Sequence, residues 1–179
     1  ISSYMTSLRK NAANSVKKII KSLDNSCFSL SLDNGDKLVV KLLVDKVCGK
    51  ATLDFTGTSP QGDNNFHAPL AVTKAAVLYV FRCLLEEEIP LNEGCFQPLK
   101  LIVPEGCLLN PIAPAAVVAG NVETSQALCN LLFGALGVMA ASQGTMNNFT
   151  FGNDDRQYYE TIAGGSGAGN GFDGSDGVQ

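Results

Sequence analysis

The sequence predicts an α+β fold, in which an antiparallel meander and further short strands pack with two or three long, partly buried helices. Three patterns predict it. Apolar residues recur at steps of three and four over residues 4–23, apolar and polar residues alternate over 27–56, and two more apolar helical stretches lie near 70–85 and 124–142. With 179 residues, 45% of them hydrophobic, the chain is long enough to bury a sizeable core.

The first helix, predicted over residues 4–23, is amphipathic. Its apolar stripe consists of Met5, Leu8, Ala12, Val16, Ile19 and Leu23. The opposite face carries five cations, Arg9, Lys10, Lys17, Lys18 and Lys21. Two interpretations of these cations stay open, a solvated face or a contact with an anionic partner, and no aromatic residue interleaves with them.

Three strands are predicted to follow the first helix, over residues 27–32, 38–44 and 51–56. The first and third alternate apolar with polar residues, and the second is rich in apolar and β-branched residues. Between the first two strands lies the Asn34-Gly35 pair, which is typical of a tight hairpin in which both central residues adopt a positive φ. These strands are therefore expected to form an antiparallel meander.

A polar loop over residues 56–69 leads into the second helix, predicted near 70–85. This stretch is apolar on all sides and contains few charges, which indicates a buried helix. Pro69 suits the first helical turn, where its missing N–H costs nothing. A short strand is predicted after this helix, over residues 99–103.

The third helix, predicted over residues 124–142, again carries apolar residues at steps of three and four. It contains Gly134 and Gly137, each of which weakens a helix by ~1 kcal/mol relative to Ala, so both are expected to allow close packing. Beyond it, residues 158–162 predict a strand. A Gly-rich loop over residues 164–171 follows that strand.

Composition excludes several classes of protein. The net charge is −4, from 13 basic and 17 acidic residues, so no nucleic-acid partner is expected. No uncharged apolar run approaches ~20 residues, so no membrane span is expected either.

Six widely spaced cysteines without a CxxC pair predict free, partly buried thiols in a reduced, cytoplasmic chain. The sequence begins within a helical pattern and ends in a Gly-rich stretch, which favours an internal piece of a longer polypeptide.

Two familiar site types have weak support. Gly169, Gly171 and Gly174 have the spacing GxGxxG, but no amphipathic helix follows them, which disfavours a dinucleotide site. His67 is the single histidine, so any Ser–His or Cys–His pair would need it, although it could equally close a turn. One histidine and scattered cysteines do not predict a zinc site, and no metal ligands are expected in this chain.

The polar turn over residues 119–125 is a more specific candidate. It opens a helix, where free backbone N–H groups and the positive end of the dipole can meet a polar ligand. Glu123 and Asn121 also have ordinary explanations, because an acid complements the dipole and an asparagine caps a helix. On spacing alone, a structural turn and a site for a small polar substrate such as a cyclic amide stay open.

Six segments, taken in order, resemble the hydantoinase B/5-oxoprolinase family. They are Leu53-Asp54-Phe55-Thr56-Gly57-Thr58, Gly62-Asp63-Asn64-Asn65, Pro90-Leu91-Asn92-Glu93-Gly94, Gly120-Asn121-Val122-Glu123-Thr124-Ser125-Gln126, Ser142-Gln143-Gly144-Thr145-Met146-Asn147-Asn148 and Gly164-Gly165-Ser166-Gly167-Ala168-Gly169. The chain is thus identified as one fragment, 1–179, of such a domain. Residues 1–57 supply the helix and meander, and 58–179 supply the family core.

The resemblance implies part of an ATP-dependent hydrolase of cyclic amides, which opens 5-oxoproline or a hydantoin. An A-type component, a partner chain or fused domain, uses the ATP and activates the ring carbonyl, and the B-type component then completes ring opening. ATP is not expected to bind here. A divalent metal is expected in a segment upstream of this chain, and the fragment alone is expected to be inactive. Homo-oligomers are compatible with this assignment.

The resemblance also carries the candidate site residues. They are Glu123, Asn121 and Thr124 for catalysis, and Asp63, Asn64, Asn65, Gly165 and Ser166 for substrate binding. His67, Ile112 and Asn170 depart from the family pattern, which has Asn, Arg and Pro there. Two other functions stay open, a non-catalytic domain that assembles with the A-type component and a fragment of a related ATP-dependent ketone carboxylase.

Overall fold

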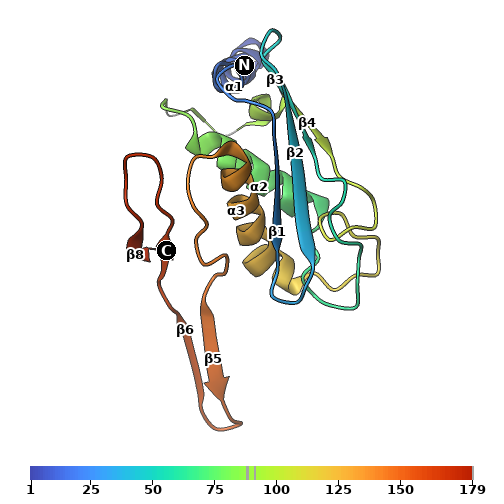
Figure 1. Ribbon diagram of the computed structural model, residues 1–179, viewed down its shortest axis with the longest axis vertical. Helices are drawn as coiled ribbons and strands as arrows, with labels where there is room; N and C mark the ends of the chain where they lie inside the picture. Colours follow the sequence, from blue (N-terminus) through green and yellow to red (C-terminus); the bar gives the residue numbers. More distant parts are fainter. Residues whose placement is uncertain (88, 91, 179) are drawn as a thin grey trace.

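The computed structural model describes residues 1–87, 89–90 and 92–178, and its centre is a four-stranded sheet with helices packed against it (Figure 1). This part contains α1 (Ser2–Ile20), β1 (Ser26–Ser31), β2 (Lys37–Asp45), β3 (Lys50–Asp54), α2 (Leu70–Cys83), β4 (Leu99–Ile102) and α3 (Ser125–Leu136). The strand order is β1-β2-β3-β4. Mixed helices and strands, mostly antiparallel, confirm the predicted α+β class.

One core joins the sheet to the helices. Leu38, Val40 and Leu42 alternate along β2 with residues that are more exposed, as expected for a strand with one buried face. The apolar residues of α1, α2 and α3 pack on the same cluster, which includes Val16, Phe81 and others up to Leu132. The apolar periodicity of the helices therefore predicted much of the core, whereas Met5 of the predicted stripe is 52% exposed and Ile20, which was outside that stripe, is fully buried.

Strand β4 pairs with β3 in parallel, with Leu53 opposite Leu101. The sequence predicts a strand here but gives no orientation for it. A parallel pair needs a crossover connection, and α2 supplies it between β3 and β4. The other pairings, β1 with β2 and β2 with β3, are antiparallel, as the meander predicts.

The turn between β1 and β2 differs from the predicted one. Gly35 has a φ of +89°, whereas Asn34 is not among the residues with positive φ. The Gly35 N–H donates to the Leu32 carbonyl at 2.9 Å, and the strands pair from Ser31 and Lys37 outward. The connection is therefore longer than a two-residue turn, so only the glycine needs the left-handed conformation.

Helix α3 ends at Leu136, before the predicted end at residue 142, because Gly137 adopts a φ of +65° and terminates it. The prediction that Gly137 allows close packing is therefore wrong, and nothing lies within 4 Å of its ideal Cβ position. Gly134 does allow close packing. An ideal Cβ there would lie 2.6 Å from Cε1 of Phe28 on β1.

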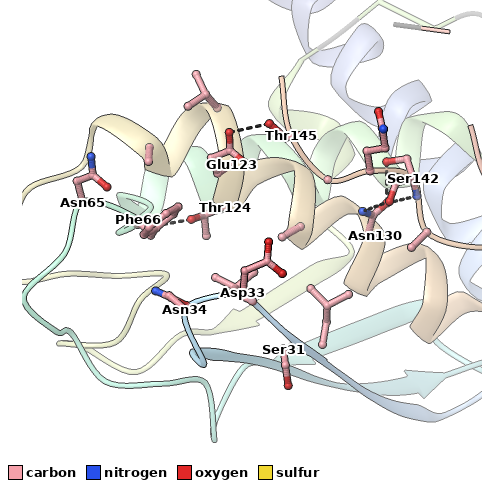
Figure 2. Close-up of a pocket in the computed structure, with 18 of the residues that line it drawn as sticks. Ser31, Asp33, Asn34, Asn65, Phe66, Glu123, Thr124, Asn130, Ser142 and Thr145 are labelled. Carbon is pink, nitrogen blue, oxygen red and sulfur yellow. Dashed lines mark hydrogen bonds between the residues drawn. The ribbon is translucent and has the colours of Figure 1, made fainter. Parts of the chain in front are cut away.

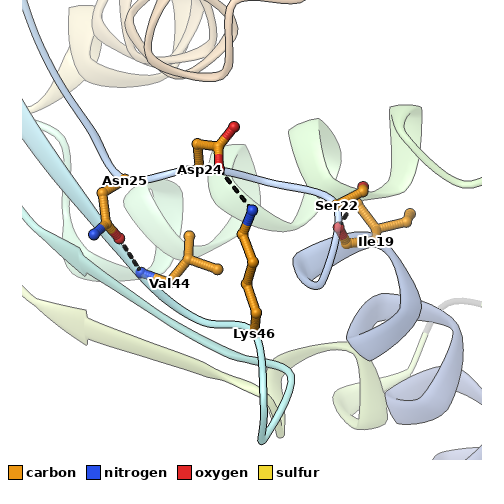
Figure 3. A network of polar contacts seen from close by, with 6 residues as sticks. All are labelled: Ile19, Ser22, Asp24, Asn25, Val44 and Lys46. Atoms are coloured by element: carbon orange, nitrogen blue, oxygen red, sulfur yellow. Dashed lines mark hydrogen bonds and ion pairs between the residues drawn. The ribbon is translucent and has the colours of Figure 1, made fainter.

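Helix α1 ends at Ile20 rather than at residue 23, and polar contacts join the following segment to β2 (Figure 3). The Asn25 side chain accepts a hydrogen bond from the Val44 N–H at 2.7 Å, and Lys46 lies 2.6 Å from Asp24. This ion pair is exposed and is worth little, so the Asn25 bond is the more specific attachment. The five helix cations are exposed except for Lys17, which is half-buried.

Two hairpins follow α3, formed by β5 (Asn148–Gly152) with β6 (Gln157–Thr161) and by β7 (Gly164–Ser166) with β8 (Ser175–Val178). The β5–β6 hairpin projects from the rest of the molecule (Figure 1). Strand β6 matches the strand predicted at 158–162, and β5 was not predicted. On one face of this hairpin the rings of Phe149, Phe151 and Tyr158 contact one another while staying exposed.

The six cysteines are free and differ in burial. Cys95 and Cys107 are buried, Cys129 is intermediate, and the other three are exposed. Among the described residues, no helix combines the length and the apolar character that crossing a membrane would require.

Candidate functional site

A pocket of about 720 Å³ lies between the β1–β2 turn, the start of α3 and the chain that follows α3 (Figure 2). The turn contributes Asp33 and Asn34, and the segment before α3 contributes Glu123 and Thr124. Residues 141–145 form the opposite wall. The pocket therefore collects side chains that are distant in the sequence, including part of the predicted turn at 119–125.

The segment that opens α3 is a π-helical turn, Gly120–Thr124. It lies so close to the loop before α2 that an ideal Cβ on Gly120 would be 2.0 Å from the His67 carbonyl oxygen. Only glycine fits there. Two bonds fasten the turn to this loop: the Ala119 N–H donates to the Asn65 carbonyl at 3.0 Å, and the Thr124 hydroxyl donates to the Phe66 carbonyl. π-Helical turns occur frequently at functional sites.

Glu123 is half-buried and lines the pocket. Its Oε1 accepts a hydrogen bond of 2.7 Å from the Thr145 hydroxyl (Figure 2). The described residues make no other hydrogen bond and no ion pair to this carboxylate. An ionised carboxylate can accept several hydrogen bonds, so Glu123 keeps acceptor capacity for a ligand or a water molecule in the pocket.

The other two residues predicted for catalysis have different surroundings. Thr124 is fully buried, and its hydroxyl proton is committed to the Phe66 carbonyl. Asn121 is exposed and is not among the residues that line the pocket. It is also not the cap of the helical segment, because the N-cap position is Ala119 and no side chain caps the turn. Of the three residues, Glu123 is the one with reactive atoms facing the pocket.

The residues predicted for substrate binding also differ in whether they line the pocket. Asn65 lines the pocket, whereas Asp63 and Asn64 do not. The Asn64 side chain holds its own loop, because Oδ1 accepts from the Phe66 N–H at 3.0 Å and Nδ2 donates to Asp36 at 3.3 Å. Asn64 is thus a turn residue here, which is a common use of asparagine.

Gly165 and Ser166 line a second pocket, of about 620 Å³. Residues 142–145 line both pockets, so this segment separates Gly165 and Ser166 from Glu123. The second pocket is bordered by Tyr79, Phe133 and Cys129. Burial raises the pKa of the Cys129 thiol to about 12. The structure therefore divides the predicted site residues between two neighbouring cavities.

Sequence reasoning did not propose several residues that line the first pocket. They are Asp33, Asn34, Asn130, Ser142, Gln143 and Thr145. Ser142 to Thr145 belong to a segment that carries the family resemblance, which was the available signal. No comparable signal existed for Asp33 and Asn34. They belong to the β1–β2 turn, and the tertiary structure brings this turn next to the segment before α3. The two ionisable side chains in the lining, Asp33 and Glu123, are both acidic.

His67 is fully buried and makes two hydrogen bonds. Its Nδ1 lies 2.8 Å from the Ala116 carbonyl oxygen, and its Nε2 accepts from the Gly62 N–H at 3.2 Å. A carbonyl can only accept, so Nδ1 carries the proton and the ring is neutral with both nitrogens satisfied. Of the two interpretations left open by the sequence, this geometry favours a structural turn residue.

The described residues do not fit a nucleotide or a metal in the usual ways. The GxGxxG spacing at Gly169, Gly171 and Gly174 falls in the loop between β7 and β8, and a strand rather than a helix follows it. Within the described part of the chain, no group of three or more His, Cys, Asp or Glu residues could hold a metal ion.

Comparison with known proteins adds independent findings. The family described as Hydantoinase B/oxoprolinase matches residues 1–179. The 5-oxoprolinase 1 of Arabidopsis thaliana is 43% identical over the whole of this chain, which covers 15% of that protein. The 5-oxoprolinase of Dictyostelium discoideum is 40% identical, again with 100% of this chain and 15% of that protein covered. The chain thus spans about 15% of the length of these relatives.

One solved structure shares the fold over nearly the whole chain. It is the ATP-dependent caprolactamase from Pseudomonas jessenii, with a TM-score of 0.72, 18% identity, and 96% of this chain and 33% of that chain covered. At this identity, the likeness concerns the fold alone.

Proposed function

Because the chain belongs to the hydantoinase B/oxoprolinase family, we propose that it supplies part of the catalytic pocket of an ATP-dependent cyclic-amide hydrolase. The substrate class is a small lactam or cyclic imide, such as 5-oxoproline or a hydantoin. The relatives named 5-oxoprolinase support this class. In this proposal the segment belongs to the B-type component and acts in the cytoplasm, and an A-type partner or domain uses the ATP.

The division of labour has a chemical reason. An unstrained cyclic amide is a poor electrophile, because its nitrogen donates electron density to the carbonyl. Activation of the carbonyl oxygen by the A-type component removes this protection. The remaining task is to bring water to the ring carbon and a proton to the ring nitrogen, and this is general acid–base chemistry that a positioned carboxylate can perform.

The single observation that carries the proposal is the Glu123 carboxylate. It lines the pocket of about 720 Å³ and can accept further hydrogen bonds besides the one from Thr145. Glu123 takes one proton from a water molecule as the water oxygen forms a bond to the activated ring carbon. The ring C–N bond then breaks, its electron pair goes to nitrogen, and Glu123 returns the proton to that nitrogen. The other water proton leaves the new hydroxyl group, whose oxygen becomes the carbonyl oxygen. The activating group stays on the former ring oxygen and is released when a second water molecule hydrolyses this activated acyl group to the carboxylate.

The neighbouring residues have supporting roles in this proposal. Asn65 offers an amide group that can pair with the polar edge of a cyclic amide, which presents one N–H and one carbonyl, whereas the amide of Asn34 is bonded to Asp36 in its own turn. Thr145 holds the Glu123 carboxylate through its hydroxyl. Thr124 fixes the turn to the loop at Phe66 and does not contact the substrate. Gly165 and Ser166, which lie in the second pocket, are assigned to a more distant part of the substrate path.

A second candidate function is assembly without catalysis. The observation that favours it is the β5–β6 hairpin, whose strands are almost entirely exposed and whose Phe149, Phe151 and Tyr158 rings form an apolar face. Exposed apolar clusters of this kind mark contacts with other protein surfaces. In this alternative, the hairpin contacts the A-type component, and the polar pocket is part of an interface. A structure of an acetone carboxylase also shares the fold, at a TM-score of 0.71 and 16% identity, with 91% of this chain and 26% of that chain covered, and this likeness too concerns the fold and does not choose between the two functions.

Replacement of Glu123 by Gln in the full-length enzyme tests the catalytic proposal. The variant keeps the shape of the side chain and an acceptor for Thr145, but loses the basic carboxylate. We expect turnover of 5-oxoproline with ATP to fall by ~100-fold or more. The free energy of unfolding should change by less than ~1 kcal/mol, as for other partly exposed substitutions.

Glu105→Gln is the matched control, because Glu105 is an exposed glutamate outside the pocket lining. It should keep wild-type turnover. Wild-type turnover in Glu123→Gln would exclude a catalytic role for this carboxylate and would favour the assembly function.

A further inference from the structure

Asn130 is a buried polar residue in the apolar middle of α3. It is 8% exposed, and Leu128, Leu131 and Leu132 around it in the helix are fully buried. An amide in such a place costs free energy unless it is hydrogen-bonded. Helix interiors also disfavour asparagine, since its side chain competes with the backbone. A tertiary contact is therefore needed to explain this residue.

Among the described residues, the Asn130 side chain makes hydrogen bonds to one residue, Ser142 (Figure 2). Its Oδ1 accepts from the Ser142 N–H at 3.1 Å and from the Ser142 hydroxyl at 3.2 Å. Its Nδ2 donates to the Ser142 carbonyl at 3.4 Å. Asn130 thus fixes the backbone of a residue in the wall of the pocket and leaves none of its own polar atoms unused.

The chain runs from Ser142 directly to the partner of Glu123. Gly144 adopts a φ of +72°, and an ideal Cβ there would lie 3.1 Å from Asn130 Nδ2, so the backbone passes close to the amide. Thr145 then donates to Glu123 at 2.7 Å, and the Met146 N–H donates to the Val122 carbonyl at 3.1 Å. The segment 142–146 is therefore held at one end by α3 and at the other by the π-helical turn.

We propose that Asn130 is a positioning residue, which sets the orientation of the Glu123 carboxylate through the 142–146 segment. This inference rests on the proposed function of Glu123. Asn130 lies about two helical turns beyond Glu123, on the same side of the continuous helical segment, so the two ends of the 142–146 segment are attached to one rigid support. Loss of either attachment lets Thr145 move, and Glu123 then loses its one hydrogen-bond partner among the described residues.

Hydrogen exchange of the full-length enzyme, followed by mass spectrometry, tests the positioning independently of activity. Asn130→Leu removes the three bonds to Ser142 with a side chain of similar volume. We expect amide exchange in a peptide covering residues 142–147 to be ~10-fold faster, because the opening of a segment is controlled by its local contacts. Asn110→Leu is the control, since Asn110 is half-buried and bonds the Val103 carbonyl in another loop. Its 142–147 peptide should exchange as in the wild type.

Turnover measurements complete the test. Asn130→Leu should lower kcat by ~10-fold with little change in KM, because Asn65, the amide proposed to hold the substrate, stays in place and the base is misaligned. Thr145→Val should have a similar effect, and Thr145→Ser, which keeps the hydroxyl, should restore turnover. Ser142→Ala removes one of the three bonds and gives a milder variant if Asn130→Leu fails to fold.

The outcomes separate this inference from the proposed function. Wild-type turnover in Glu123→Gln overturns the proposed function, whatever hydrogen exchange shows. The positioning role alone is overturned if Glu123→Gln is slow but the 142–147 peptide of Asn130→Leu exchanges as in the wild type. If Asn130→Leu is not folded, the same comparison is made with Ser142→Ala. Faster exchange with wild-type turnover in these variants also overturns it, because the segment would then move without affecting Glu123.

Discussion

Replacing Gly120 by Ala adds one methyl group where the π-helical turn crosses the backbone of the loop before α2. An ideal Cβ at this position lies 2.0 Å from the His67 carbonyl oxygen and 3.0 Å from the Ala68 Cα. Both neighbours are backbone atoms, so no side-chain rotation relieves the overlap. A carbon and an oxygen normally stay ~3.3 Å apart. The turn and the loop must therefore separate by roughly 1.3 Å, the difference between these distances.

This separation affects the bonds that fasten the turn. The Ala119 N–H to Asn65 carbonyl bond, at 3.0 Å, would lengthen beyond hydrogen-bonding range, and so would the bond from Thr124 to the Phe66 carbonyl. Each bond contributes ~1 kcal/mol, and overpacking costs ~1–3 kcal/mol in addition. Gly120→Ala should therefore lower the free energy of unfolding by ~3–5 kcal/mol.

Urea denaturation followed by circular dichroism measures this difference. Gly62→Ala is the matched control, because its ideal Cβ meets only the end of the Asn64 side chain, at 3.3 Å, and its φ is outside the left-handed region. Gly62→Ala should change the free energy of unfolding by less than ~1 kcal/mol. Equal midpoints for Gly120→Ala and Gly62→Ala would refute the close approach of the turn to the loop, and with it the reason for glycine at position 120.

Two other predictions concern residues outside the lining of the first pocket. His67→Leu should lower the free energy of unfolding by ~2–4 kcal/mol, because it leaves the Gly62 N–H and the Ala116 carbonyl without their partner, and thermal denaturation that matches the wild type would contradict the structural role. In iodoacetamide labelling of the native protein at pH 8, Cys129, whose pKa is raised to about 12 by burial, should react at least ~100-fold more slowly than exposed Cys27. The labelling rate of Cys129 should still rise with pH between 8 and ~10, since a higher pKa means that the thiolate forms only at higher pH. Labelling is measured by peptide mass spectrometry, and equally fast labelling of the two cysteines would contradict the burial of Cys129.

The candidate site could be predicted from the sequence only in part. Glu123 was proposed because it belongs to a polar turn between two apolar segments, within a segment that carries the family resemblance, and the structure places it in the pocket wall. Thr124 belongs to the same turn, but its hydroxyl donates to the Phe66 carbonyl and so attaches the turn to the loop before α2. The sequence does not show that this loop is close enough to accept the bond. The positioning role of Asn130 could not be recognised from the sequence, because it depends on hydrogen bonds to Ser142, which only the tertiary structure places next to Asn130.

The sequence specified the helices, the meander and much of the core through local patterns, because burial of apolar residues imposes a period of 3.6 on helices and 2 on strands. It also contained the order of segments that assigns the family. The parallel pairing of β4 with β3 and the division of the predicted site residues between two pockets became apparent in the tertiary structure alone. These features depend on contacts between residues far apart in the chain, such as Glu123 with Thr145 and Gly120 with His67, for which local periodicity carries no information.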